Sequence, residues 1–249
     1  MSKIVGIIPA RYASTRFPGK MLHPLCGKPL IQHVWERVSL SKELDEVIIA
    51  TDDIRIAEVA FNFGAKVSMT RADHPSGSDR VAEVAAKLKN ATHILNIQGD
   101  EPSIHPKLID ALCKELRKDS SIRMITAATP LEDPEEIQNP NCVKVIFNQK
   151  GNAIYFSRLP IPYYRDKEKQ PDSGHFLHLG IYGFKRSTLL KFVSWPKSPL
   201  ESAEELEQLR ALDHQLKIKI HLTPHRSFGI DSPEDAAAFE KNDKNSQIS

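Results

Sequence analysis

Short apolar and β-branched runs alternate with stretches of helical periodicity through the first half of the chain. Strands are predicted over residues 3–8, 47–50, 66–69 and 93–98. The first of these runs is continuously apolar after Lys3, which is typical of a central parallel strand that is buried on both faces.

Between these strands, apolar residues recur at the three- and four-residue spacing of helices. We predict a helix opened by Pro29, a second capped by Asp52 or Asp53 and ended by Gly64, and two more over 79–88 and 106–116. The alternation of strands and helices predicts an α/β fold: a three-layer α/β/α arrangement around a mostly parallel sheet.

This alternation weakens after about residue 120. A charged, proline-rich stretch over 159–173 is predicted to be irregular, and Ser232 is predicted to cap a closing helix before a frayed tail at 241–249. A helix is also predicted over 200–212, and strands over 123–129, 143–147, 153–156, 176–184 and 217–222. Without a repeat or a clear linker, residues 1–249 are predicted to form one domain with an antiparallel insertion at about 150–200.

The composition excludes several functional classes. The chain has 249 residues and a formal net charge of +2, which is too balanced for a protein that coats nucleic acid. Its three cysteines lack a CxxC spacing, so neither a disulfide framework nor a zinc site is indicated, and a cytoplasmic location is expected. No apolar run approaches the ~20 residues that span a bilayer.

The segment from Pro9 to Lys20 follows the first predicted strand, at the sheet edge where open α/β folds bind ligands. Arg11, Arg16 and Lys20 alternate there with small residues, so this loop is predicted to hold a polyphosphate. It matches neither the Walker A nor the GxGxxG pattern. The alternative interpretation is a solvated basic loop.

Two acidic positions suggest a metal. Asp100 ends the fourth predicted strand in Gln98-Gly-Asp-Glu, and beside a phosphate loop it is a natural Mg²⁺ anchor; the alternative interpretation is that it caps the next loop. Asp231 precedes the helix capped by Ser232, so it either caps that helix or supplies a second metal ligand.

Taken together, these segments resemble the CMP-Kdo synthetases, also called 3-deoxy-manno-octulosonate (Kdo) cytidylyltransferases. The matching segments occur in order along nearly the whole chain. They are Ile8–Lys20, Gly27–Pro29, Ala50–Asp52, Thr70–His74, Gln98–Pro102, Asn139–Val145, Tyr155–Arg158, His178–Gly183, Ser198–Glu201, Leu206–Arg210 and Gly229–Asp235.

The resemblance implies a GT-A-like fold, a homodimer, and Mg²⁺-dependent transfer of CMP from CTP to Kdo for lipopolysaccharide inner-core synthesis, with pyrophosphate released. It implies that Lys20, Asp100 and Arg16 are catalytic and that Asp100 and Asp231 bind the metal. The implied nucleotide-binding residues are Ala10, Arg11, Arg16, Lys20, Arg71, Ser76, Gly77 and Ser78. The implied sugar-binding residues are Gln98, Arg158, Arg165, His178, Tyr182, Glu207 and Gln208, and the insertion is expected to contribute to the sugar site and the dimer contact.

Other functions are compatible with parts of this pattern. A CMP-sialate synthetase or another nucleotidyltransferase would use a similar triphosphate loop. A glycosyltransferase would use the Gln98-Gly-Asp-Glu segment as its metal motif but would release no pyrophosphate. A non-catalytic nucleotide-binding regulator would bind CTP without turnover. Neither nucleic acid nor membrane insertion is expected.

Overall fold

The computed structural model describes residues 2–13, 17–166, 171 and 174–246. The chain forms two compact units: residues 1–110 with 227–249, and residues 111–226. The insertion predicted at 150–200 lies inside the second unit. Because two compact units can still share one cooperative fold, the single-domain organisation stays a prediction. Within the described residues, no helix has the length and apolar character required to cross a bilayer.

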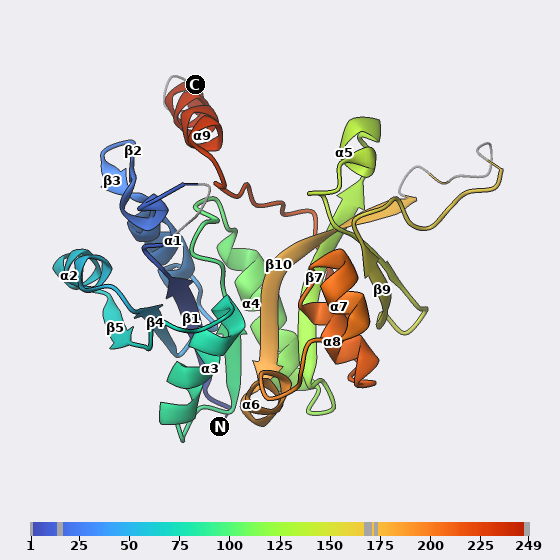
Figure 1. Ribbon diagram of the computed structural model, residues 1–249, viewed down its shortest axis with the longest axis horizontal. Helices are drawn as coiled ribbons and strands as arrows, with labels where there is room; N and C mark the ends of the chain where they lie inside the picture. Colours follow the sequence, from blue (N-terminus) through green and yellow to red (C-terminus); the bar gives the residue numbers. More distant parts are fainter. Residues whose placement is uncertain (1, 14–16, 167–170, 172–173, 247–249) are drawn as a thin grey trace. The chain divides into compact units, whose positions relative to one another are not determined.

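The first unit is built on a parallel sheet (Figure 1). Its strands, in spatial order, are β6 (His93–Asn96), β1 (Ile4–Ala10), β4 (Glu46–Thr51) and β5 (Lys66–Met69). Ile4, Val5, Ile7 and Ile8 of β1 are completely buried, as the continuous apolar run predicts for a central strand. The predicted α/β class is confirmed: strands are mostly parallel and helices lie on both sides.

The helices of the first unit begin and end at residues that the sequence marks. They are α1 (Leu30–Ser39), α2 (Ile54–Asn62), α3 (Gly77–Lys87), the start of α4 (Pro106–Lys118) and α9 (Pro233–Ser246). Asp53 caps α2 by accepting a hydrogen bond from the backbone N–H of Arg55, and Gly64 follows that helix at φ +88°. Ser76 caps α3 through the N–H of Asp79. Part of the tail predicted to fray over 241–249 instead continues α9 to Ser246, and residues 247–249 lie outside the described residues.

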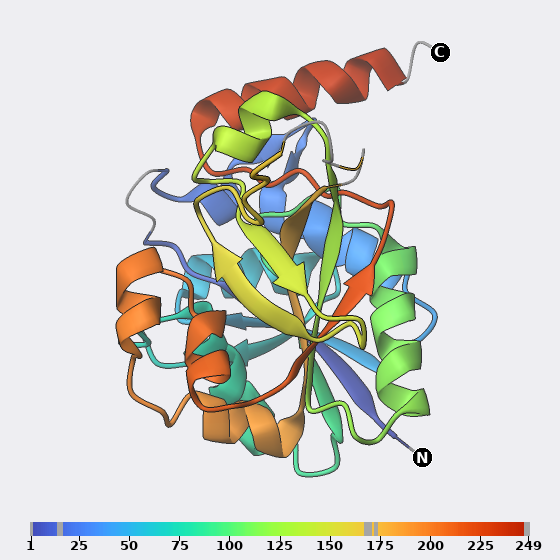
Figure 2. The same ribbon diagram turned by 90° about the vertical axis from the view of Figure 1, so that its right-hand side faces the viewer.

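A short 3₁₀ turn and a hairpin between β1 and α1 were not predicted. They are η1 (Lys20–Leu22), β2 (Pro24–Leu25) and β3 (Lys28–Pro29). Figure 2 and the contacts of α9 with β2 place that last helix beside the hairpin. The ring of Phe239 in α9 also lies 5.9 Å from that of His33 in α1. The C-terminal segment therefore packs on the same unit as the N-terminal strand.

The second unit holds the antiparallel strands. In it β10 (His175–Lys185) pairs antiparallel with β7 (Met124–Leu131) and with β8 (Lys144–Phe147). Strand β9 (Ala153–Ser157) pairs antiparallel with β8, and β11 (Ile218–Leu222) runs parallel to β7. Its helices are α5 (Pro134–Gln138), α6 (Arg186–Phe192), α7 (Pro199–Glu204) and α8 (Gln208–Asp213). Neither α5 nor α6 was predicted from the sequence.

The single helix predicted over 200–212 is wrong in one respect, because the structure divides it into α7 and α8. Glu205 adopts the left-handed conformation at φ +51° and ends α7. Leu206 behind it is buried, and the buried Glu201 of α7 pairs with Arg210 of α8 at 2.6 Å. Packing of the two short helices against each other therefore stabilises a break that helical periodicity does not reveal.

Candidate active site

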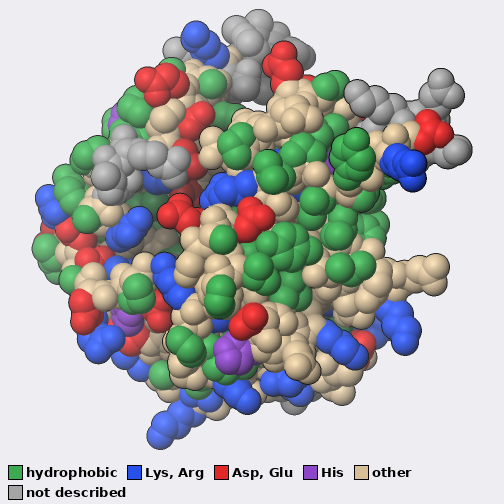
Figure 3. All heavy atoms as spheres, turned by 45° about the vertical axis from the view of Figure 1, so that its right-hand side comes forward, with side chains coloured by type: hydrophobic (Ala, Val, Ile, Leu, Met, Phe, Trp, Pro, Cys, Tyr) green, Lys and Arg blue, Asp and Glu red, His purple; other side chains and the backbone are tan. Residues whose placement is uncertain are grey.

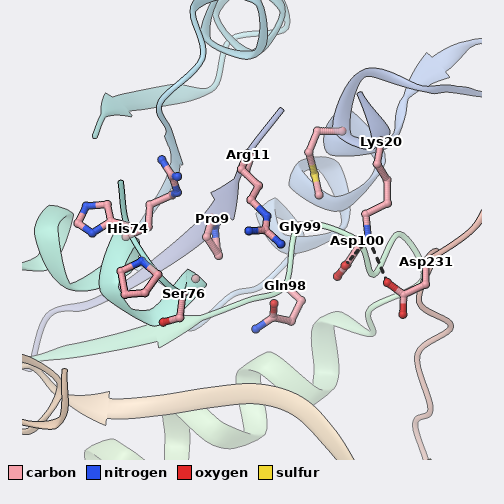
Figure 4. A pocket seen from close by; sticks show the side chains of 14 residues that line it. Pro9, Arg11, Lys20, His74, Ser76, Gln98, Gly99, Asp100 and Asp231 are labelled. Carbon is pink, nitrogen blue, oxygen red and sulfur yellow. Dashed lines mark hydrogen bonds and ion pairs between the residues drawn. The ribbon is translucent and has the colours of Figure 1, made fainter. Parts of the chain in front are cut away.

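A pocket of about 290 Å³ opens at the carboxyl ends of β1 and β6 in the first unit. This is the edge of a parallel sheet at which α/β folds bind ligands. In Figure 4, His74 and Ser76 lie at one end of the pocket and Lys20, Asp100 and Asp231 at the other, with Arg11 and Gln98 between them. The lining residues are Pro9, Ala10, Arg11, Lys20, Met21, His74, Pro75, Ser76, Gly77, Arg80, Gln98, Gly99, Asp100 and Asp231.

The acidic end of the pocket is organised around Lys20. Its side chain is buried, and its Nζ donates hydrogen bonds to Asp100 Oδ2 at 2.7 Å and to Asp231 Oδ1 at 3.3 Å (Figure 4). Two carboxylates that are 131 positions apart in the chain therefore converge on one cation. The basic loop was predicted to lie close to both Asp100 and Asp231, and the contacts of Lys20 confirm this.

Backbone contacts hold the two acidic segments together. The N–H of Ile230 donates to the carbonyl of Asp100 at 2.8 Å, and a Cβ on Gly99 would lie 2.7 Å from the carbonyl oxygen of Pro9. Only glycine therefore permits this approach of the segment after β6 to the end of β1. Ser232 accepts the N–H of Asp235 as the cap of α9, which leaves the Asp231 carboxylate facing Lys20.

Glu101, the residue after Asp100, has a raised pKa. The pKa of Glu101 is raised to about 7, mainly by burial and to a smaller extent by the negative charges of Asp100 and Asp231, although the Ser227 hydroxyl, which donates to Glu101 at 2.6 Å, partly opposes this shift. Glu101 therefore retains its proton at a pH at which an ordinary glutamate is ionised, which limits the negative charge at this end of the pocket.

The donor set at the acidic end fits a magnesium ion shared with a phosphate ligand. The part of the chain that the structure describes contains no cluster of three or more His, Cys, Asp or Glu side chains that could enclose a metal. Mg²⁺, however, is usually held by only one or two carboxylates, with substrate phosphates and water completing the shell. Asp100 and Asp231 supply such a pair, and the Lys20 ammonium between them shows that the space suits a cation.

The other end of the pocket is the N-terminus of α3. Ser76 and Gly77 line it, as does the buried Arg80, one turn further along the same helix. Arg80 Nη1 lies 2.9 Å from Asp52 Oδ1 and donates to Thr70 Oγ1. A helix N-terminus carries partial positive charge, so this end is also suited to an anionic ligand.

Not every residue of the implied nucleotide set lines the pocket. Ala10, Arg11, Lys20, Ser76 and Gly77 do. The structure does not bring the other described members there. Arg71 is exposed and pairs with Asp73 at 3.4 Å, while Ser78 is buried and accepts a hydrogen bond from Asn96. Arg16 lies outside the described residues.

Four of the lining residues were not predicted from the sequence, namely Met21, His74, Pro75 and Arg80. Met21 follows Lys20 in η1, and neither His74 nor Arg80 was predicted from the sequence to line the site. Both of these do have protein partners, since His74 lies 2.6 Å from Glu83. The spacing of Ser76 and Arg80 by one helical turn was the available signal that both face the same side of α3.

Two members of the implied sugar set lie on β10 of the second unit. His178 and Tyr182 have ring centroids 5.4 Å apart and flank a β-bulge, and Thr126 lies 3.0 Å from His178 Nε2. Burial lowers the pKa of His178 to about 3. The imidazole is therefore neutral at physiological pH, so it can hydrogen-bond a hydroxyl without carrying charge.

Three further members meet around the connection between α7 and α8. The guanidinium of Arg158 donates to the carbonyls of Pro140 and Glu204, at 2.9 and 2.6 Å, and also to that of Glu205. Glu207 and Gln208 follow directly at the start of α8. Among the described residues, the buried Gln208 Nε2 has no hydrogen-bond partner. An unpaired buried amide is costly and is consistent with a donor reserved for a ligand.

Gln98 also belongs to the implied sugar-binding set, and it lines the pocket of the first unit. Arg165 is exposed in the irregular segment before residue 167. The structure therefore groups the implied sugar residues around β10 and α8, with Gln98 in the first unit and Arg165 apart on an exposed loop.

Known proteins that are similar to this chain agree with the function that the geometry of the pocket suggests. A family model described as "Cytidylyltransferase" matches residues 5–218. The fold and the pocket, with a basic loop, a helix N-terminus and paired carboxylates at one sheet edge, are those of a nucleotidyltransferase of this class.

Three individual relatives are more specific. A 3-deoxy-manno-octulosonate cytidylyltransferase of Solibacter usitatus is 50% identical over 94% of this chain and 91% of the relative, and one of Thermodesulfovibrio yellowstonii is 48% identical over 94% and 96%. A solved structure of a CMP:2-keto-3-deoxy-manno-octonic acid synthetase complexed with CTP is 39% identical, covers 98% of this chain and all of the other, and has a TM-score of 0.93. The chain belongs to the family of 3-deoxy-manno-octulosonate cytidylyltransferases.

Proposed function

We propose that this enzyme transfers CMP from CTP to 3-deoxy-D-manno-octulosonate and releases pyrophosphate. The observation that carries the proposal is the convergence of Asp100, Asp231 and Lys20 in a pocket at the end of β1. The relatives named for this reaction are similar over almost the whole chain, including the one solved with CTP.

In this reaction a sugar hydroxyl oxygen forms a bond to the α-phosphorus of CTP, and the bond from that phosphorus to the pyrophosphate oxygen breaks. Negative charge accumulates on the α-phosphoryl and pyrophosphate oxygens, so the protein contributes mainly by positioning and by electrostatic stabilisation. Arg11 and Lys20 supply fixed positive charge in the pocket, and the N-terminus of α3 supplies backbone donors. We assign Arg16, in the same basic loop, to this phosphate-binding role.

Magnesium is the proposed cofactor, with Asp100 and Asp231 as its protein ligands. When bound, Mg²⁺ would neutralise phosphoryl oxygens and acidify the attacking hydroxyl. In this structure Lys20 lies between the two carboxylates, and the retained proton of Glu101 limits the repulsion between neighbouring acids. No histidine base is required in this scheme.

The sugar is proposed to bind to the second unit's His178, Tyr182, Glu207 and Gln208, together with Gln98 and the two arginines Arg158 and Arg165. The orphaned amide of Gln208 and the neutral imidazole of His178 support recognition of hydroxyl groups. Arg158 is proposed to bind the sugar carboxylate, for which a guanidinium fork is well shaped. In this structure three of its five N–H groups donate to backbone carbonyls, and we propose that the second N–H of each Nη binds the carboxylate.

The resemblance also supports a cytoplasmic homodimer that serves lipopolysaccharide inner-core synthesis. Figure 3 shows hydrophobic side chains gathered on the face turned toward the viewer. In the second unit, Ile154 of β9 is 55% exposed and Leu159 beyond it is 71% exposed. Apolar exposure of this kind is typical of surfaces that bind another protein. Light scattering during gel filtration tests the dimer, and a monomeric mass would contradict it.

The reaction is tested by incubating the enzyme with CTP, Mg²⁺ and Kdo and measuring pyrophosphate. Pyrophosphate should appear with Kdo, and EDTA in excess over Mg²⁺ should abolish its release. Sialic acid in place of Kdo tests the neighbouring class of CMP-sugar synthetases. Faster release with sialic acid than with Kdo, or none with either sugar, would overturn the proposal.

A further inference from the structure

We propose that Arg55 is a positioning residue that shapes the nucleotide loop through the ring of Tyr12. We define the nucleotide loop by its described residues, 11–13 and 17–20. The proposal rests on the proposed function, because it assumes that this loop binds the triphosphate of CTP. Arg55 itself is half exposed and does not line the pocket, so it can influence the nucleotide only through the loop.

The first observation is a stacked contact between two distant segments. The guanidinium carbon of Arg55, in the first turn of α2, lies 3.4 Å from the centroid of the Tyr12 ring. Tyr12 directly follows Arg11, which lines the pocket. A guanidinium over an aromatic face is attracted by the ring and also packs flat against it.

The second observation is that the guanidinium is held in a fixed plane. Arg55 Nε donates to Asp53 Oδ1 at 2.9 Å and Nη2 donates to Asp53 Oδ2 at 2.6 Å. Asp53 is also the cap of α2, where it accepts the backbone N–H of Arg55. The fork of two bonds therefore ties the stacking group to the rigid start of a helix rather than leaving it on a flexible stem.

The third observation connects Tyr12 with the other end of the loop. The carbonyl of Tyr12 accepts the N–H of Gly19 at 3.2 Å, and a Cβ on Gly19 would lie 3.3 Å from the Tyr12 hydroxyl. Gly19 has φ +70° and is followed by Lys20. Tyr12 thus contacts the residue that precedes the central cation of the acidic site, and the ring that Arg55 covers packs beside that residue.

These contacts form a continuous support from α2 to the pocket. Arg11 and Lys20 are the two described cations of the loop, and each is the chain neighbour of a residue in the Tyr12–Gly19 contact. An exposed ion pair such as Arg55–Asp53 stabilises a fold very little. Its expected effect is therefore on preorganisation of the loop, and hence on CTP binding, rather than on unfolding.

The test is calorimetric binding of CTP with Mg²⁺ to the full chain, without sugar. Arg55→Gln should weaken CTP binding roughly three- to tenfold, in line with the strength of a cation–π contact. KM for CTP should rise by a similar factor, with KM for Kdo unchanged. Tyr12→Phe, which keeps the ring, should bind CTP like the wild type, and Arg55→Gln should cause no further loss once Tyr12 is replaced by Leu.

Lys66→Gln is the matched control, since it also removes one exposed positive charge and one ion pair beside α2, here with Glu46. It should leave CTP binding unchanged, and both variants should melt within a few degrees of the wild type. The proposal is overturned if Arg55→Gln binds CTP as tightly as the wild type or if Lys66→Gln weakens binding equally. If the wild type does not bind CTP, the proposed function fails instead.

Discussion

At the scale of single residues, Lys20 determines the electrostatics of the acidic site. Lys20 is only 6% exposed, and its ammonium contacts both Asp100 and Asp231. A buried ammonium is costly unless it is paired, and two converging carboxylates repel each other unless a cation lies between them. Lys20 and the metal proposed for this site therefore compete for the same carboxylate oxygens.

We predict that Lys20→Met tightens binding of a divalent cation to the nucleotide-free enzyme by about tenfold or more, because unit charges a few ångströms apart interact by several kcal/mol near a protein surface. Mn²⁺ binding followed by electron paramagnetic resonance measures this. Lys28→Met, which removes an exposed lysine paired with Glu36, is the control and should change nothing. Unchanged or weaker Mn²⁺ binding in Lys20→Met would contradict the competition.

His178 gives a second prediction, on pH dependence. Its folded-state pKa of about 3 lies below the ordinary 6.5, so from pH 6.5 down to 3 the unfolded chain binds a proton that the folded chain does not. Stability that is present above pH 6.5 is therefore lost on acidification. Between pH 7 and 5, His178→Gln should reduce this loss by roughly 1–2 kcal/mol in urea unfolding. Parallel pH dependences of the two proteins would disprove the assignment.

At the scale of elements, the site depends on how closely the segment after β6 approaches β1. Gly99 lies where a Cβ would be 2.7 Å from the Pro9 carbonyl oxygen and 3.2 Å from Met21 Sδ. Backbone oxygen cannot yield as a flexible side chain can, so a side chain at this position would force the segment after β6 and the end of β1 apart.

Gly99→Ala should therefore lower the free energy of unfolding by about 1–3 kcal/mol, the usual cost of overpacking, and should also weaken CTP binding. Gly77→Ala provides the comparison for stability, because its new Cβ would meet its nearest neighbour at an ordinary 3.5 Å. Thermal and urea unfolding measure both variants. Equal stability of the two would mean that the approach of Gly99 to β1 imposes no steric restriction.

The elements themselves divide into those that the sequence reveals and those that it does not. Strand β1 and helix α2 follow from a continuous apolar run and from the Asp53 cap with Gly64, which are local signals. The break at Glu205 has no local signal, because a glutamate rarely adopts a left-handed conformation and only the packing of α7 on α8 favours it. The β2–β3 hairpin is too short to show any periodicity.

At the scale of the whole chain, the sequence predicted which residues lie at the sheet edge, but it did not predict that Asp231 pairs with Lys20 there. The carboxyl ends of parallel strands share one edge, so Arg11, Lys20 and Asp100 were expected to meet there. The sequence left open whether Asp231 caps α9, since only the folded chain shows Ser232 in that position. Ser78 was expected near the nucleotide, yet the helical rotation of α3 turns it to Asn96.

The most direct test of the central claim, that Asp100 and Asp231 form a metal-dependent phosphoryl-transfer centre with Lys20, is the turnover of Asp100→Asn. Pyrophosphate release is measured at saturating CTP, Kdo and Mg²⁺, with circular dichroism verifying the fold. The account predicts that kcat falls well below a tenth of the wild-type value. Retention of more than about a tenth, a loss of only ~1.4 kcal/mol in transition-state stabilisation, would contradict it.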